Sequence, residues 1–187
     1  MNRKLDGRKI AILVADGFEQ VEMTEPRKAL EAAGAKTDLI SPDGKEVQGM
    51  NHHDKGDKFP ADRALSKAAA QDYDALLLPG GVANPDKLRT IPEAVQFAKD
   101  FASAGKPIAA ICHGPWLLVE ANLVKDRRMT SWPSLQTDIR NAGGQWEDSQ
   151  VAADHGVVTS RKPDDIPAFN QRMIEEFASA QQPVAAQ

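Results

Sequence analysis

The sequence predicts an α/β fold with a mostly parallel sheet and helices on both of its faces. Short apolar runs alternate along the chain with longer stretches of helical periodicity, and strands that are apolar on both faces are typical of buried parallel sheets. The 187 residues contain no internal repeat and no linker. We therefore expect a single domain over 1–187, with a core at about 7–179 and a terminal tail at 180–187.

The individual elements follow from short apolar runs and from the glycines and prolines that bound them. Buried strands are expected at 9–15, 36–41, 74–78 and 106–111. Shorter strands are expected at 47–50, 151–153 and 157–160. Helices are expected at 22–33, 64–71, 92–104, 115–121, 133–142 and 163–178.

Charge and hydropathy restrict the partners and the compartment. The formal net charge is −4, which gives no electrostatic reason to expect nucleic acid or an anionic membrane as a partner. No apolar run is long enough to span a bilayer, and the run at 10–15 is too short for a signal peptide. We expect a cytoplasmic protein that binds neither nucleic acid nor membrane.

Cofactor and metal motifs are missing from the sequence. Neither phosphate-binding glycine pattern, G-x-x-x-x-G-K-[ST] or G-x-G-x-x-G, occurs, and neither does the zinc motif H-E-x-x-H. The cluster His52-His53-Asp54 is interpreted as a solvated loop, and His155 as structural. Ser131 and Ser134 lack the G-x-S-x-G frame of a serine hydrolase. No cofactor and no metal are expected.

The single cysteine, Cys112, lies directly between a predicted buried strand and an apolar helix. A residue in that position occupies a sharp turn with its side chain above the sheet, as in a nucleophile elbow. The start of the following helix favours thiolate over thiol. A lone cysteine can also be a small buried hydrophobe, but the adjacent His113 and the turn Gly80-Gly81 favour a nucleophile.

Two backbone N–H groups are candidates for an oxyanion hole. Gly81 follows the strand at 74–78, and His113 follows the cysteine, so both N–H groups would lie at the carboxyl edge of the sheet. Neighbouring side chains at an elbow usually point apart. His113 is therefore expected to orient or polarise rather than to act as an ideal base for Cys112.

A carboxyl group after the first strand would reach the same edge of the sheet. If protonated, it could donate a hydrogen bond to the thiolate and lower the pKa of the cysteine. Glu19, Glu22 and Glu25 all compete for this role, and each could instead serve the helix dipole. The residues alone do not choose among them.

The chain resembles the PfpI-type intracellular proteases, within the superfamily of class I glutamine amidotransferase domains. The resemblance covers nearly the whole chain and is carried by KIAILVADGFEQVEMTEP, FPADRAL, YDALLLPGGVANPDKLR, KPIAAICHGPWLLVEANLVKDRRMTSWPSLQTDIRNAGGQW and VVTSRKPDDIPAFNQRMIEEF. The combination of A-I-C-H-G-P-W-L-L with L-P-G-G is highly specific. The resemblance implies a flavodoxin-like sandwich that is usually a homodimer or a larger homo-oligomer.

The resemblance also implies roles for single residues. Cys112 would be the nucleophile, Glu19 the acidic residue beside the thiol, and His113 the neighbouring histidine. Asp86 would match a carboxylate that, in some members, contacts this histidine from a second subunit. The backbones of Gly81 and His113 would supply the oxyanion donors.

The resemblance and these residues together imply two functions, and the stress response and the carbonyl substrates come from the resemblance. The first is a stress-response cysteine hydrolase in which Cys112 attacks a carbonyl, with a reactive dicarbonyl or a glycated adduct favoured over the peptide bond of a protease. The second is a redox-sensing or chaperone-like stress protein without turnover, in which Cys112 is oxidised. One fold hosts several chemistries, so the substrate does not follow from the fold.

Overall fold

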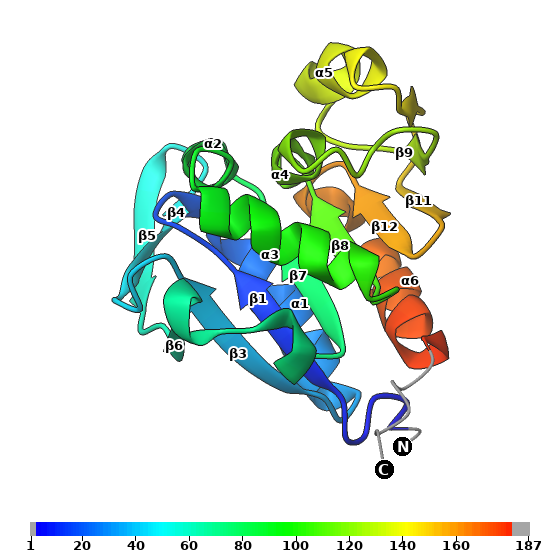
Figure 1. The fold of residues 1–187 in the computed structure, drawn as a ribbon. Coiled ribbons are helices and arrows are strands. Elements are labelled where there is room, and N and C mark those ends of the chain that lie inside the picture. The colour runs from blue at the N-terminus through cyan, green and yellow to red at the C-terminus, as the bar shows by residue number, and fades with distance from the viewer. Residues whose placement is uncertain (1–2, 181–187) are drawn as a thin grey trace.

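The computed structural model describes residues 3–180 and is built on a seven-stranded central sheet with helices on both faces (Figure 1). The predicted tail at 180–187 lies outside the described residues, apart from Ala180. In spatial order the strands are β11 (Val151–Asp154), β12 (Val157–Ser160), β8 (Ile108–Ile111), β7 (Ala75–Leu78), β1 (Lys9–Leu13), β3 (Lys36–Ser41) and β6 (Arg63–Ala64). Every neighbouring pair is parallel except β11 with β12, which confirms the predicted mostly parallel sheet.

The two faces of the sheet carry different helices. One face packs against α1 (Gln20–Ala32) and α6 (Ile166–Ser179). The other packs against α2 (Ala83–Leu88), α3 (Pro92–Ser103), α4 (Pro115–Glu120) and α5 (Gln136–Asn141). Figure 1 shows α3 in front of the central strands and α1 behind them. The predicted sandwich with helices on both faces is confirmed.

Side chains that alternate along a strand pack into the two hydrophobic cores on opposite faces of the sheet. In β1, Ile10 and Ile12 join the core under α1 and α6, whereas Ala11 and Leu13 join the core under α3. All four side chains are fully buried. A strand covered on both faces has no polar alternation, and this is why its sequence reads as a continuous apolar run.

Smaller elements surround the central sheet. A three-stranded sheet is formed by β2 (Phe18–Glu19), β4 (Val47–Asn51) and β5 (Asp54–Phe59). A two-stranded sheet is formed by β9 (Arg128–Met129) and β10 (Gln145–Trp146). Among residues 3–180, none of the helices is long and apolar enough to cross a membrane.

The predicted helix at 64–71 is wrong. Two 3₁₀ turns, Leu65–Lys67 and Ala70–Asp72, occupy this stretch, and the residues between them are extended. An isolated helix of this length is marginal in water. The segment instead follows an irregular path across the face of α3, and Leu65 and Ala70 are buried there. Tertiary packing therefore overrides the helix propensity of the alanines.

The order of the strands positions the site. Strands β8, β7 and β1 are parallel neighbours, and the three features singled out in the sequence each follow one of them. Cys112 follows β8, Gly80-Gly81 follows β7, and the segment from Asp16 to Glu19 follows β1. All three therefore meet at the carboxyl edge of the sheet, where parallel α/β sheets bind their ligands.

Candidate active site

Cys112 is held in a strained turn between β8 and α4. Its φ is +62°, in the left-handed region that non-glycine residues seldom adopt. Two hydrogen bonds fix the backbone there: its N–H donates to the Ser160 carbonyl at 3.0 Å, and its carbonyl accepts from the Trp132 N–H at 2.9 Å. The predicted sharp turn between a strand and a helix is confirmed, and 6% of Cys112 is exposed.

Glycines on both sides make room for this elbow. A Cβ atom at Gly80 would lie 2.5 Å from Oε2 of Glu22 and 2.7 Å from Cβ of Cys112. A Cβ atom at Gly114 would lie 2.6 Å from the Leu78 carbonyl oxygen. Side chains at these positions would collide with the thiol, with the buried carboxyl or with the neighbouring strand, so the elbow depends on glycine at both.

The sulfur atom faces two backbone donors. The N–H groups of Gly81 and His113 both hydrogen bond toward Sγ of Cys112 and lower the pKa of the thiol, whereas burial and a charged Glu22 raise it. Burial has the largest effect of these, so the pKa of the thiol is raised overall. These two donors are the N–H groups that the sequence analysis named as candidates for an oxyanion hole, and in the structure both face Sγ.

Glu22 is the carboxyl group that contacts the thiol. It lies in the first turn of α1 with none of its surface exposed, and its Oε2 accepts a hydrogen bond from the Gly80 N–H at 2.9 Å. Its side chain is paired with Cys112. Burial is the main reason why the pKa of Glu22 rises to about 8, and Glu22 therefore carries its proton at neutral pH.

The protonation of Glu22 decides the sign of its effect on the cysteine. A carboxylate beside Sγ repels a thiolate and raises the pKa of Cys112, whereas a carboxylic acid donates a hydrogen bond to the thiolate and lowers that pKa. Oε1 of Glu22 makes no hydrogen bond within residues 3–180, whereas Oε2 accepts from the Gly80 N–H. At neutral pH this oxygen is therefore free to carry the proton of the acid.

The prediction that Glu19 lies beside the thiol is wrong in the structure. Glu19 belongs to β2, just before α1, and its carboxylate accepts hydrogen bonds from the His52 N–H at 3.1 and 3.3 Å. Glu25, the third candidate, is exposed. The rotation of α1 directs Glu22 toward the sheet, whereas Glu19 is hydrogen bonded to the backbone of the β4–β5 hairpin.

The imidazole of His113 points back toward the cysteine. Nδ1 of His113 lies 3.2 Å from Sγ of Cys112, although the sequence led us to expect the two side chains to point apart. Burial lowers the pKa of His113 to about 4. The ring is therefore neutral near pH 7 and has a lone pair available to accept a proton.

A cavity of about 480 Å³ opens above the sulfur atom. Its walls come from the segment after β1, the β4–β5 hairpin, the turn after β7, the elbow, Trp132 and Pro163. Val82 and Trp132 line it and are, among residues 3–180, the large apolar side chains that remain exposed, by 57% and 39%. The lining contains neither lysine nor arginine.

His52, His53 and Trp132 are site residues that the sequence analysis missed. The two histidines follow β4 and line the cavity, although their sequence suggested only a solvated loop. Their place depends on the pairing of β4 with β2, which no local pattern indicates. Within the described chain, no group of three or more His, Cys, Asp or Glu side chains is arranged to hold a metal ion.

Asp86 does not line the cavity above Cys112. It lies on α2, is exposed, and borders a separate surface hollow with Arg89 and Lys99. Within one chain, the structure therefore does not bring Asp86 together with His113. The role that the resemblance implies for Asp86, a contact from a second copy, stays a prediction.

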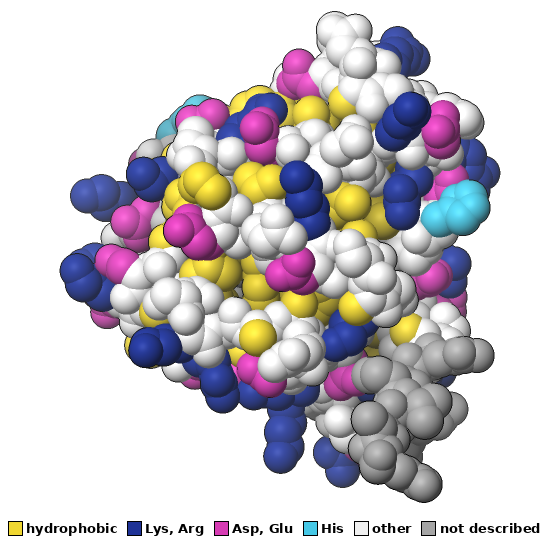
Figure 2. Space-filling view, in the orientation of Figure 1, with side chains coloured by type: hydrophobic (Ala, Val, Ile, Leu, Met, Phe, Trp, Pro, Cys, Tyr) yellow, Lys and Arg dark blue, Asp and Glu magenta, His cyan; other side chains and the backbone are white. Residues whose placement is uncertain are grey.

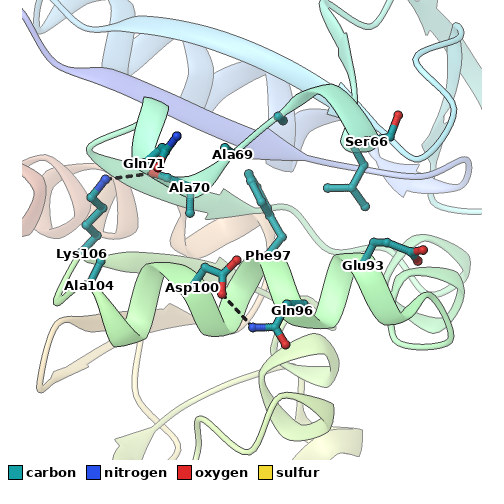
Figure 3. Close-up of a pocket in the computed structure, with 12 residues that line it drawn as sticks. Ser66, Ala69, Ala70, Gln71, Glu93, Gln96, Phe97, Asp100, Ala104 and Lys106 are labelled. Atoms are coloured by element: carbon teal, nitrogen blue, oxygen red, sulfur yellow. Dashed lines mark hydrogen bonds between the residues drawn. The ribbon is translucent and has the colours of Figure 1, made fainter.

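A second cavity contrasts with the one above Cys112. It measures about 680 Å³ and lies between α3 and the segment 65–72, on the face where Figure 2 shows hydrophobic side chains gathered among charged ones. In Figure 3, Phe97 points from α3 toward Ala69 and Ala70. Gln96 donates to Asp100, and Lys106 donates to the Ala70 carbonyl. Among the described residues, neither cysteine nor histidine lines this second cavity.

The fold and this site define a class of α/β proteins that carry a cysteine at a strand-to-helix elbow. A thiol, a neutral imidazole, a protonated carboxyl group and two backbone donors converge at the base of one cavity. These are the parts needed to add sulfur to a carbonyl carbon and to stabilise the resulting oxyanion.

This chain belongs to the DJ-1/PfpI family, whose model it matches over residues 8–176. It is 44% identical over 168 residues to the "Putative cysteine protease YraA" of Bacillus subtilis, covering 89% of this chain and 96% of that protein. It is 40% identical over 170 residues to the "Protein/nucleic acid deglycase 2" of Escherichia coli, with coverages of 89% and 96%. The crystal structure of Drosophila melanogaster DJ-1beta superposes with a TM-score of 0.83 at 25% identity, covering 91% of this chain and 90% of that one.

Proposed function

We propose that this protein is a cysteine hydrolase in which Cys112 attacks the carbonyl carbon of a small, uncharged dicarbonyl or of its adduct. The observation that carries the proposal is the arrangement of Sγ, which lies 3.2 Å from a neutral imidazole nitrogen and faces two backbone donors below a cavity. The names of the two bacterial relatives, a putative cysteine protease and a deglycase, are consistent with a cysteine-dependent hydrolase.

The size and charge of the cavity favour a small substrate. A volume of about 480 Å³ lies in the lower part of the range for small-molecule sites. A peptide chain would need an extended cleft in addition. Among the described residues, no lysine or arginine lines the cavity to bind a carboxylate or phosphate, and Glu19 adds an acidic group to the lining. Uncharged carbonyl compounds fit these walls best.

Methylglyoxal illustrates the chemistry. The Cys112 thiol loses its proton to Nδ1 of His113, and Sγ adds to the aldehyde carbon while the Gly81 and His113 N–H groups stabilise the oxyanion. Protonation of that oxygen gives a hemithioacetal. Transfer of its C–H proton to the adjacent ketone carbon, through an enediol, gives a lactate thioester. Water then hydrolyses the thioester, releasing lactate and restoring the thiol.

The test is methylglyoxal consumption by the purified, fully reduced protein, with lactate as the measured product. We expect many turnovers per chain in the wild type and none in Cys112→Ala. Equal rates for the two proteins would remove Cys112 from the reaction. Absence of turnover from a wild-type protein whose Cys112 still reacts rapidly with iodoacetamide would contradict the proposed substrate and favour the redox alternative.

The alternative, an oxidation sensor, is favoured by one observation. Cys112 is the sole cysteine of the chain, so oxidation cannot proceed to an internal disulfide and leads to sulfenic or sulfinic acid. The protonated Glu22 beside it can donate a hydrogen bond to a sulfinate. Peroxide titration followed by mass spectrometry tests this: a sensor oxidises at Cys112 before any methionine, and prior oxidation of methionine would contradict it.

A further inference from the structure

The His113 ring is bracketed by two polar side chains. Nδ1 lies 3.2 Å from Sγ of Cys112, and Nε2 lies 3.4 Å from Oγ of Ser134. Ser134 belongs to the 3₁₀ turn Pro133–Leu135, which precedes α5. A thiol, an imidazole and a hydroxyl thus form a continuous line within one chain, and Ser134 is the only member that lies at the exposed edge of the site.

The plane of the imidazole is fixed by two indoles. Trp132 stacks on it at a centroid distance of 5.7 Å and an interplanar angle of 23°, and Trp116 meets it edge-on at 5.1 Å. Trp116 is itself held by a hydrogen bond from Nε1 to Asp138, at 2.9 Å. Because the ring cannot rotate freely between these indoles, its two nitrogen atoms keep their separate partners.

The turn that carries Ser134 is tied to the elbow. The Trp132 N–H donates to the Cys112 carbonyl at 2.9 Å, and the Leu135 N–H donates to the Trp132 carbonyl at 3.0 Å. The position of Ser134 is therefore set by the same backbone that sets the cysteine. Ser131 cannot replace it, because its hydroxyl donates to the Trp132 carbonyl and accepts from Nε1 of Trp146.

Proton transfer from the thiol imposes one requirement on Nε2. For Nδ1 to accept the thiol proton, the neutral ring must carry its own proton on Nε2, and the imidazolium that forms also carries it there. In both states Nε2–H needs an acceptor. A hydroxyl oxygen at 3.4 Å can accept this bond, and catalytic hydrogen bonds are often long before substrate binds.

We propose that Ser134 is a positioning residue that accepts the Nε2–H hydrogen bond of His113 and so stabilises the imidazolium formed when Cys112 loses its proton. A single chain then contains a continuous line of interacting side chains from Cys112 through His113 to Ser134. This inference rests on the proposed function only for the role of Cys112 as nucleophile, and its readouts require no substrate.

The experiment compares five substitutions by two measurements. Three change the proposed acceptor: Ser134→Ala, Ser134→Thr and Ser134→Asp. Asp86→Asn tests the carboxylate that a second copy could supply, and Thr137→Ala is the matched control, which removes an exposed hydroxyl from α5 nearby. The measurements are the pH dependence of Cys112 alkylation by iodoacetamide and the side-chain ¹⁵N chemical shifts of His113, which report where the ring carries its protons. Circular dichroism establishes that each variant is folded.

We expect Ser134→Ala to slow alkylation near pH 7 about three- to tenfold, because a hydrogen bond to a charged group is lost at a partly exposed position. Ser134→Thr should restore the rate, and Ser134→Asp should accelerate it and raise the pKa of His113. Thr137→Ala should leave both measurements unchanged. A purely structural role for Ser134 would leave the ¹⁵N shifts of a folded Ser134→Ala variant as they are in the wild type.

Two outcomes would overturn the proposal. One is an unchanged alkylation profile and unchanged ¹⁵N shifts in a folded Ser134→Ala variant. The other is loss of the imidazolium signal in Asp86→Asn but not in Ser134→Ala, which would assign the acceptor to a second copy of the chain. Failure of methylglyoxal turnover, by contrast, affects only the proposed function, since neither readout depends on it.

Discussion

The elbow around Cys112 and the first turn of α1 supply the two halves of the same site, yet they differ in how their side chains are positioned. At the elbow, the thiol, the imidazole and the His113 N–H are placed by two adjacent residues, and the Gly81 N–H joins them from the turn after the neighbouring strand β7. In α1, the partner of the thiol is selected among Glu19, Glu22 and Glu25 by the rotation of a whole helix. Local chemistry determines the first, and packing between elements determines the second.

The buried residues of α1 show which side of the helix faces the sheet. Met23, Pro26 and Leu30 pack toward the sheet, and Glu22 extends the same stripe by one residue. A carboxyl group in phase with an apolar stripe is unusual, because a buried acid needs a partner or a proton. The spacing of Glu22 relative to Met23, Pro26 and Leu30 is therefore the sequence signal for a buried acid. The sequence analysis missed this signal because it started the helix at 22 rather than at Gln20.

The largest effect expected from this comparison is on stability. The pKa of Glu22 is about 8 in the folded chain, against 4.5 as the ordinary value, so the folded state binds more protons between these pH values. The stabilisation by the buried acid is complete below about pH 4.5 and is lost as the pH rises toward 8. Between pH 5 and 7 the free energy of unfolding should fall by about 3 kcal/mol from this group.

Urea denaturation of wild type and Glu22→Gln across this pH range measures the effect. The amide keeps the acceptor for the Gly80 N–H but does not ionise, so the decline should be absent or much reduced in the variant. Glu19→Gln serves as the control, because Glu19 is bonded to the His52 backbone rather than enclosed with the thiol. Parallel pH profiles for wild type and Glu22→Gln would show that Glu22 is not a buried neutral acid.

The next effect concerns the reactivity of the thiol and depends on the sign of the Glu22 interaction. At pH 7 a protonated Glu22 stabilises the Cys112 thiolate, so Glu22→Leu should raise the pKa of the thiol by about one to two units. Alkylation near neutral pH should slow about 10- to 100-fold. The rate of iodoacetamide reaction as a function of pH measures both.

Glu19→Leu is the matched control for this experiment and should change the alkylation profile little. The result separates three cases. Slower alkylation in Glu22→Leu supports a protonated donor. Faster alkylation would mean that Glu22 is ionised and repels the thiolate, and a larger change in Glu19→Leu would restore the assignment that the sequence resemblance implied.

The same contrast explains which parts of the fold were predictable. The buried strands were recognised because each is enclosed on both faces, as the run from Ile10 to Leu13 is. Short apolar runs of this kind fit few other secondary structures. The segment 64–71 was not, because its short run of alanines satisfies a helix pattern while Leu65 and Ala70 are buried from 3₁₀ turns. His52 reached the site through strand pairing, which depends on residues far away in the sequence.

The smallest expected effect concerns Glu19, whose interaction with the β4–β5 hairpin leaves a carboxylate near the mouth of a cavity that lacks lysine and arginine. An anionic substrate should be repelled relative to a neutral one of similar size. With glyoxal and glyoxylate as the pair, Glu19→Gln should improve the kcat/KM for glyoxylate relative to that for glyoxal by a few-fold, about 1 kcal/mol for one charge at a partly solvated site. The effect should diminish at high ionic strength. An unchanged ratio would mean that Glu19 only anchors the hairpin, and that the preference for neutral carbonyl compounds comes from the apolar wall formed with Val82 and Trp132.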